Sequence, residues 1–105
     1  RNLAEASAHP EFRLEVADIS EPLPPRLREE RFDRVYNLAC AASPPRYQAR
    51  PVHTLLTSVL GTRHLLELAE ACGARFLLAS TSEVYGDPAV HPQPEDYRGN
   101  VSTTG

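Results

Sequence analysis

The stretch from residue 51 to residue 80 constrains the fold most, because a long helical pattern there leads directly into a short apolar segment. Apolar residues recur at spacings of three, four and seven along its first part, which is typical of an amphipathic helix. Pro51 suits the first turn of a helix, and Gly73 suits the left-handed residue that ends one. We therefore expect a single helix over residues 51–72, with a strand immediately after it.

Gly61 lies in the middle of this predicted helix. Glycine in a helix interior costs roughly 1 kcal/mol relative to alanine. We therefore expect another backbone to approach the helix closely at Gly61.

The segment at residues 75–80 is apolar almost throughout, as is typical of a strand buried on both faces in a parallel sheet. Residues 12–17 alternate apolar and polar side chains, which is the pattern of a strand. The expected elements are a strand at 12–17, a short helix at 27–31, strands at 34–39 and 75–80, the helix at 51–72, and a long loop from residue 86 onward. This βαβαβ order predicts a partial Rossmann-like, doubly wound parallel α/β sheet with right-handed crossovers and a long loop at its C-terminal end.

Composition narrows the chemistry that the chain can perform. All 11 basic residues are Arg, so the chain offers no lysine for a Schiff base or a phosphate loop. The net charge of −3 and the lack of a long apolar run give no reason to expect nucleic acid or a membrane as a partner. Neither the four histidines nor Cys40 and Cys72 have the spacing of a metal site, and we expect two reduced thiols in a cytoplasmic protein.

Small or polar side chains follow each predicted strand, where ligands bind in open α/β sheets. Asp18 follows the first strand, and it can accept a hydrogen bond from a heterocycle or cap the turn before Pro22. The small residues at 38–43 can admit a flat ligand or can serve helix packing. Residues 80–83 place three hydroxyls and a carboxylate after the third strand, where they can take part in proton transfer or cap a turn.

Three stretches of the chain carry a resemblance to a known family. They are Asp18-Ile19 with Glu21-Pro-Leu23; Leu38-Ala-Cys-Ala-Ala-Ser-Pro-Pro45 with Tyr47; and the run from Ala74 through Thr81-Ser-Glu-Val-Tyr-Gly-Asp-Pro88 to His91-Pro-Gln93, Glu95, Tyr97, Gly99-Asn-Val101 and Gly105. On these residues the chain resembles the UDP-glucuronate decarboxylases, which are extended short-chain dehydrogenase/reductases that make UDP-xylose. The resemblance extends over nearly the whole chain from Phe12 onward.

The resemblance implies a reaction in three stages on a UDP-sugar substrate, with NAD as the cofactor. The C4 hydroxyl of UDP-glucuronate is oxidised, CO2 leaves from the resulting β-keto acid, and the ketone is reduced again. One alternative is a UDP-glucuronate 4-epimerase or another nucleotide-sugar epimerase or dehydratase. A second alternative is a dinucleotide-binding module without catalytic activity.

The resemblance also assigns site residues in three groups. Thr81, Ser82 and Glu83 are implied as catalytic, with Thr81 near the C4 hydroxyl and the other two near C5 and the carboxylate. The implied cofactor residues are Asp18 and Ile19 at the adenine, Leu38, Ala39 and Cys40 on the adenosine side, Thr57 on the long helix, and Ala79 and Ser80 beneath the nicotinamide. Pro44, Pro45 and Tyr47 are implied to form a loop on the substrate side, and no metal is implied.

The family's organisation provides the remaining expectations. Residues 1–105 would be a central part of a single NAD-binding domain, with the glycine-rich phosphate loop upstream and a Tyr-x-x-x-Lys pair downstream. Such a chain by itself would be inactive and would bind NAD weakly or not at all. The family pairs through the long helix, so we expect a homodimer through residues 51–72. Leu60, Leu65 and Leu68 are the candidate contacts, and the alternative is that they pack on the protein's own sheet.

Overall fold

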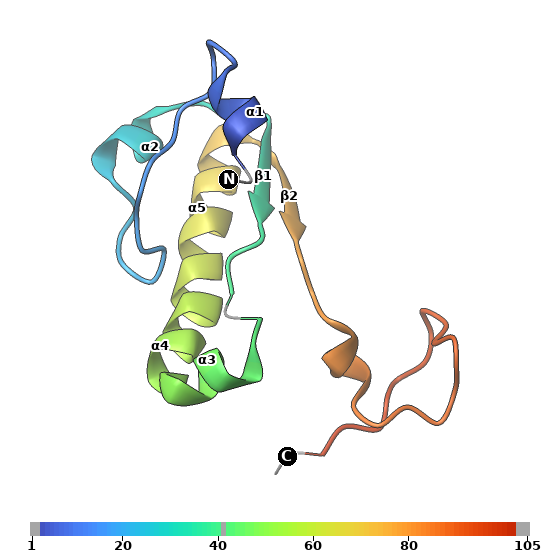
Figure 1. Cartoon of the computed structure of the whole chain (residues 1–105). Coiled ribbons are helices and arrows are strands. Elements are labelled where there is room, and N and C mark those ends of the chain that lie inside the picture. The colour runs from blue at the N-terminus through green and yellow to red at the C-terminus, as the bar shows by residue number, and fades with distance from the viewer. Residues whose placement is uncertain (1–2, 41, 103–105) are drawn as a thin grey trace.

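A two-stranded parallel sheet and one long helix form the ordered centre of the molecule (Figure 1). The structure is a computed structural model that describes residues 3–40 and 42–102. The elements are α1 (Ala4–Ser7), α2 (Pro25–Glu29), β1 (Arg34–Asn37), α3 (Pro44–Ala49), α4 (Pro51–Leu56), the π-helical turn η1 (Thr57–Gly61), α5 (Thr62–Cys72), β2 (Arg75–Leu78) and the 3₁₀ turn η2 (Ser82–Tyr85).

The predicted helix at residues 51–72 is confirmed, since α4, η1 and α5 follow one another without a break. Pro51 occupies the first helical position, and Gly73 ends the helix in the left-handed conformation with φ of 67°. The hydroxyls of Thr57 and Ser58 donate to carbonyl oxygens four residues earlier, at 2.9 and 3.0 Å. Such bonds compete with the helix's own hydrogen bonds, and they occur where the backbone widens into the π-helical turn.

Gly61 is buried, but the prediction that another backbone approaches it is wrong. The neighbour is the side chain of Ile19. A Cβ atom built on Gly61 would lie 2.5 Å from Ile19 Cδ1 and 2.6 Å from Ile19 Cγ1. Glycine is therefore required here because it makes room for a side chain of the segment that precedes α2.

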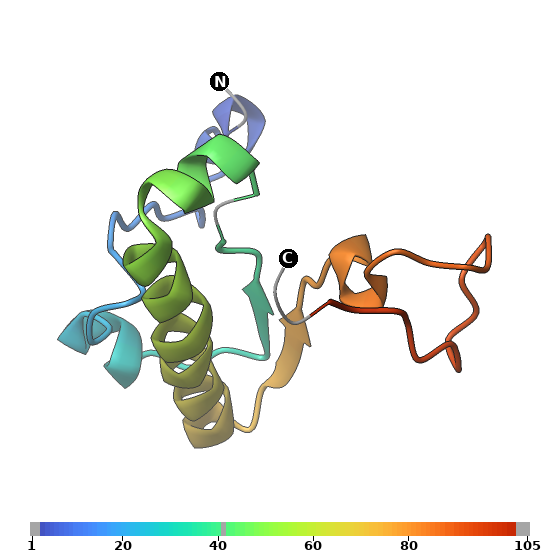
Figure 2. The ribbon, with the colours of Figure 1, turned by 90° about the horizontal axis from the view of Figure 1, so that it is seen from below.

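β1 and β2 pair in parallel, with Arg34 opposite Arg75 and Asn37 opposite Leu78. The helix covers one face of this pair (Figures 1 and 2), and the inward-facing Val35 and Asn37 are buried. The prediction that the strand at 75–80 is buried on both faces is wrong for this chain. Leu77 points away from α5 and is 47% exposed, and Leu78, next to the end of the pair, is 53% exposed.

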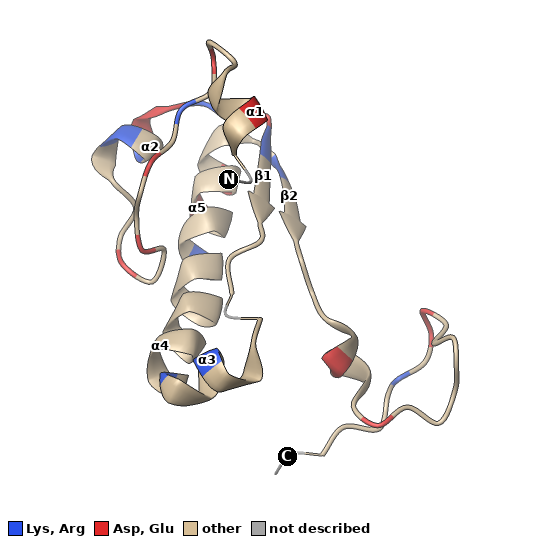
Figure 3. Ribbon diagram, in the orientation of Figure 1, with Lys and Arg blue, Asp and Glu red and all other residues tan. Residues whose placement is uncertain are grey.

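The predicted strand at residues 12–17 does not form, so the full βαβαβ order is not confirmed. A strand needs a hydrogen-bonding neighbour, and this segment runs on the far side of the long helix from the sheet (Figures 1 and 2). Its alternating apolar side chains include Val16, which is 90% exposed. Charged residues occur along this segment and along α2 (Figure 3). Arg13 forms an ion pair with Glu30 at 2.8 Å, and Glu15 forms one with Arg26 at 3.0 Å. The observed architecture is a small parallel α/β unit.

Two short helices differ from the predictions. α2 occupies Pro25–Glu29 instead of residues 27–31, because Pro25 fits the first helical position and the helix starts there. α3 occupies the stretch that the resemblance implied to be a loop. Its two prolines lie at the first positions of the helix, where a missing N–H costs nothing. Leu68 was expected to be an intermolecular contact, yet it is buried within the chain at 8% exposure.

The predicted loop from residue 86 onward is closed at its base by backbone hydrogen bonds. Asp87 N–H donates to Asn100 O at 3.0 Å, and Asn100 N–H donates to Tyr85 O at 2.9 Å. Within the loop, Tyr97 stacks at a tilt against Tyr85, and its hydroxyl accepts from Ala89 N–H at 3.1 Å. The loop projects away from the helix and sheet (Figures 1 and 2).

The contact at Gly61 predicts the sign of a stability change. Helix propensity alone would make Gly61→Ala stabilising, whereas the overlap with Ile19 should make it destabilising by about 1–3 kcal/mol. Urea unfolding measures the difference. The double variant Gly61→Ala with Ile19→Ala removes the overlap, so it should lose less stability than the sum of the two single variants. A stabilising Gly61→Ala would contradict this packing.

Candidate functional site

The carboxyl ends of β1 and β2 lie side by side at one edge of the sheet. Asn37 pairs with Leu78 in the register, and Ala79 N–H donates to Asn37 O at 3.0 Å. Residues 38–40 and residues 79–80, which were predicted as cofactor residues, therefore leave the sheet next to each other. Ala41 and Gly105, which also belong to the stretches that carry the resemblance, lie outside the described residues.

This edge has exposed and mostly small side chains. Ala39, Cys40, Ala79 and Ser80 are exposed, and Leu38 is 71% exposed. A flat heterocycle or a sugar can therefore approach the backbone here without displacing buried groups. The thiol of Cys40 lies 3.3 Å from the hydroxyl of Ser58, which places the end of this segment against the long helix.

A buried amide supports the end of β1. Asn37 is 2% exposed, its Oδ1 accepts from Ala39 N–H at 3.1 Å, and its Nδ2 donates to Thr62 Oγ1 at 3.0 Å. Sequence reasoning missed this residue. The available signal was a polar residue at an inward-facing position of a strand, two residues after the buried Val35.

Asp18 and Ile19 lie against the long helix instead of following a strand. Asp18 Oδ1 accepts from the backbone N–H of Ser20 at 2.9 Å and from its hydroxyl at 2.7 Å, so Asp18 caps its own turn. These two hydrogen bonds, led by the one from the Ser20 side chain, hold the pKa of the Asp18 carboxyl below its usual value. The Asp18 carboxylate also lies 3.8 Å from His53 Nε2, and Ile19 O lies 2.9 Å from His64 Nδ1.

The predicted catalytic corner at residues 81–83 follows β2 directly. Thr81 is the residue before η2, and its Oγ1 accepts from Glu83 N–H at 3.2 Å, so the capping alternative is realised there. The side chains of Thr81, Ser82 and Glu83 are all exposed.

The other predicted residues lie on the helices. Pro44, Pro45 and Tyr47 belong to α3, which packs against α4, and Tyr47 is 37% exposed. Thr57 lies in η1, where its hydroxyl donates to His53 O at 2.9 Å. The structure thus brings residues 38–40 and 79–80 together at one edge. Asp18 and Ile19 contact the long helix instead, at His53, Gly61 and His64.

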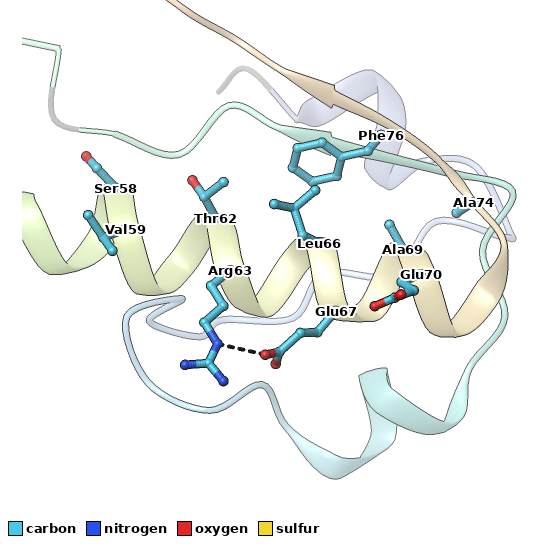
Figure 4. A pocket seen from close by; sticks show the side chains of 10 residues that line it. All are labelled: Ser58, Val59, Thr62, Arg63, Leu66, Glu67, Ala69, Glu70, Ala74 and Phe76. Atoms are coloured by element: carbon cyan, nitrogen blue, oxygen red, sulfur yellow. Dashed lines mark hydrogen bonds and ion pairs between the residues drawn. The ribbon is translucent and has the colours of Figure 1, made fainter.

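A hollow lies between α5 and β2, and Ser58 in its lining is 3.3 Å from the Cys40 thiol. Its lining is Ser58, Val59, Thr62, Arg63, Leu66, Glu67, Ala69, Glu70, Ala74 and Phe76 (Figure 4). Phe76 and Leu66 approach each other across it, and Arg63 Nε pairs with Glu67 Oε1 at 2.7 Å at its rim. None of the predicted site residues lines this hollow, so we do not assign the substrate to it.

Within residues 3–40 and 42–102, no group of three or more His, Cys, Asp or Glu side chains could hold a metal ion. Among the helices of the same residues, none is both long and apolar enough to cross a membrane.

The fold and the edge define a small parallel α/β unit of the Rossmann type. The family model described as GDP-mannose 4,6 dehydratase matches residues 1–100. The chain belongs to this family of extended short-chain dehydrogenase/reductases.

Curated proteins provide a closer comparison. The chain is 54% identical to UDP-glucuronic acid decarboxylase 3 of Arabidopsis thaliana over 104 aligned residues. The aligned residues make up 99% of this chain and 29% of that protein. It is 53% identical to UDP-glucuronic acid decarboxylase 5 of the same plant, with the same coverage. It is 50% identical to UDP-glucuronic acid decarboxylase 1 of Danio rerio over 105 aligned residues, and this alignment covers 100% of this chain and 24% of that protein. The chain thus spans less than a third of the length of these relatives.

The hydrogen bonds from Ser20 to Asp18 predict how a substitution at Ser20 changes the pKa of Asp18. Ser20→Ala removes the hydroxyl donor, which is the largest cause of the lowered pKa, so the pKa of Asp18 should rise toward its usual value. NMR titration of the Asp18 side chain measures it. Because the folded pKa is below the unfolded one, the turn's contribution to stability is present above the usual carboxyl pKa and is lost as pH falls through the folded value. Arg50→Gln is the matched control, since Arg50 is the smallest of the causes and should change the pKa less.

Proposed function

We propose that this chain acts within a UDP-glucuronate decarboxylase, which converts UDP-glucuronate to UDP-xylose with NAD as its cofactor. The observation that carries the proposal is the sustained identity of about half of all positions, over 99–100% of the chain, to proteins named UDP-glucuronic acid decarboxylase. The chain would form a central part of the NAD-binding domain.

The exposed edge after β1 and β2 is where we place the cofactor. Residues 38–40 would contact its adenosine side and residues 79–80 its nicotinamide side, because these two segments leave the sheet next to each other. Asp18 and Ile19 would contact the adenine, and Thr57 would contact the cofactor from the long helix. Bound NAD supplies a site that accepts a hydride from the sugar and later returns it.

The corner at residues 81–83 would act on the sugar. Thr81 accepts a hydrogen bond from Glu83 N–H through an oxygen lone pair, so its hydroxyl proton can be donated to a sugar oxygen near C4. The exposed carboxylate of Glu83, with Ser82 beside it, would orient the sugar's C5 and its carboxylate or hold the proton that C5 receives. Pro44, Pro45 and Tyr47 of α3 would line the substrate side.

The chemistry of the sugar explains why oxidation at C4 precedes loss of CO2. A ketone at C4 makes the C6 carboxylate a β-keto acid, so the electrons of the C5–C6 bond pass into an enolate when CO2 leaves. C5 then takes up a proton, and return of the hydride to C4 yields the pentose. No net oxidation occurs, which is consistent with a cofactor that is regenerated in each cycle.

Product analysis of the complete protein that carries this chain tests the proposal. Incubation with UDP-glucuronate and NAD should release CO2 and form UDP-xylose, identified by NMR. A UDP-hexuronate inverted at C4, formed without CO2, would establish a 4-epimerase instead. Binding of NAD with no turnover would establish a binding module.

Glu83 provides the residue-level prediction. Glu83→Gln keeps the size of the side chain but removes the carboxylate, so it should lower kcat about 100-fold or more if Glu83 transfers a proton or orients the reacting groups. Steady-state release of CO2 measures it. Asp96→Asn, which removes an exposed carboxylate from the C-terminal loop, is the control and should leave kcat unchanged. Equal activity of the two variants would remove Glu83 from the mechanism.

We also propose that the protein forms a homodimer through residues 51–72. The support is the row of exposed apolar side chains on this helix, among them Val52 at 68%, Leu55 at 62% and Val59 at 56% exposure. Leu68 is buried inside the chain, so the contacts are better sought among these exposed residues.

A charge placed on this surface should separate the protomers. Leu55→Glu puts a carboxylate into an apolar interface, which has no partner for it, so sedimentation equilibrium of the complete protein should show a monomer. Gln48→Glu, at an exposed position of α3, adds the same charge outside the proposed interface at residues 51–72 and should leave the dimer intact. A Leu55→Glu variant that sediments as a dimer would place the interface elsewhere.

A further inference from the structure

We propose that Asn37 is a positioning residue, which fixes the cofactor-side segment at residues 38–40 and is itself held in place by Thr62 of α5. The inference deepens the proposed function, because it rests on the assignment of that segment to NAD. Neither Asn37 nor Thr62 belongs to the residues assigned to the cofactor, the sugar or the reaction.

The hydrogen bonds of Asn37 leave one orientation for its side chain. Ala39 N–H can only donate, so the atom 3.1 Å away must be the amide oxygen. The amide nitrogen then faces Thr62 Oγ1 at 3.0 Å and donates to it. If the amide rotated by half a turn, two donors would face each other at Ala39, so the Ala39 N–H selects the orientation. The bond to Thr62 then holds the oriented side chain in place.

Because Asn37 is buried, the loss of one of its hydrogen bonds would be costly. Asn37 is 2% exposed, so water cannot replace a lost partner without opening the structure. The backbone oxygen of Asn37 accepts from the N–H of Ala79 at 3.0 Å. Ala79 is the first residue of the second segment assigned to the cofactor, residues 79–80. One residue therefore connects the ends of both strands, and its side chain connects them to the helix.

Thr62 is well placed for this role. It is the first residue of α5, directly after the π-helical turn, and its side chain points from the helix toward the strand layer (Figure 4). The preceding residue, Gly61, receives the side chain of Ile19. At these two consecutive positions the helix therefore contacts Ile19, which is assigned to the adenine, and Asn37, which directly precedes residues 38–40.

A pair of substitutions at Thr62 tests the inference in the complete protein. Thr62→Val keeps the shape of the side chain but removes the acceptor, whereas Thr62→Ser keeps the hydroxyl. We expect Thr62→Val to raise the Kd for NAD about three- to tenfold, in the range that one net hydrogen bond supports. Thr62→Ser should stay within about twofold of the unsubstituted protein, since it retains that bond. Calorimetric titration with NAD gives Kd without any reliance on turnover.

Amide hydrogen exchange provides the second readout, on the protein without ligand. The Ala39 N–H should exchange faster in Thr62→Val than in Thr62→Ser, because the oxygen that protects it is no longer held in place. An unchanged Kd and unchanged exchange at Ala39 in Thr62→Val would overturn the inference, even if its Tm fell. An equal rise of Kd in both variants would also overturn it.

The outcomes separate this inference from the proposed function. A protein that binds NAD but releases no CO2 contradicts the decarboxylase alone, and the Kd comparison then still decides the role of Asn37. A protein that does not bind NAD at all contradicts both.

Discussion

The parallel pairing of β1 with β2 is the constraint on which the rest of the arrangement depends. Parallel neighbours cannot be joined by a tight turn, so the chain between Asn37 and Arg75 has to cross one face of the pair. The helix over residues 51–72 makes that crossing, and Gly73 turns the chain back so that Arg75 N–H can donate to Asp33 O at 3.0 Å. Because both strands then run in the same direction, their carboxyl ends share one edge, and the small residues that follow them become neighbours.

The elements that could be predicted are those whose signals are local. The helix at 51–72 and the strands that begin at residues 34 and 75 have periodicity, end signals and short connections within their own sequence. The segment at 12–17 has the alternation of a strand, but a strand also requires a neighbour, and the described residues offer it none. Val16 is consequently exposed, where the alternation predicted a buried side chain. α3 was missed for a different reason, since the same prolines that break a helix interior are compatible with its first turn.

The candidate site also has one part that could be predicted from the sequence and one part that could not. The position of residues 38–40 and 79–80 at a common edge follows from parallel topology, and the sequence was sufficient to predict it. The contact of Ile19 with Gly61 and the bond of Asn37 to Thr62 were beyond sequence reasoning, because each joins residues at least 25 positions apart whose meeting depends on how the helix is rotated against its neighbours. Gly61 alone indicated a close neighbour, and the partners of both Gly61 and Asn37 are defined only by the packed structure.

Capping and ligand contact were treated as competing roles for Asp18 and Thr81, yet the geometry allows both at once. Thr81 caps η2 with an oxygen lone pair and keeps its proton for a second partner. Asp18 uses Oδ1 for Ser20, while Oδ2 faces His53 at 3.8 Å. A capping bond restricts the side chain to one rotamer, and a group already held in place loses less conformational entropy when it meets a ligand. A local cap of this kind therefore prepares a side chain for contact with a ligand, provided that the cap leaves one donor or acceptor available.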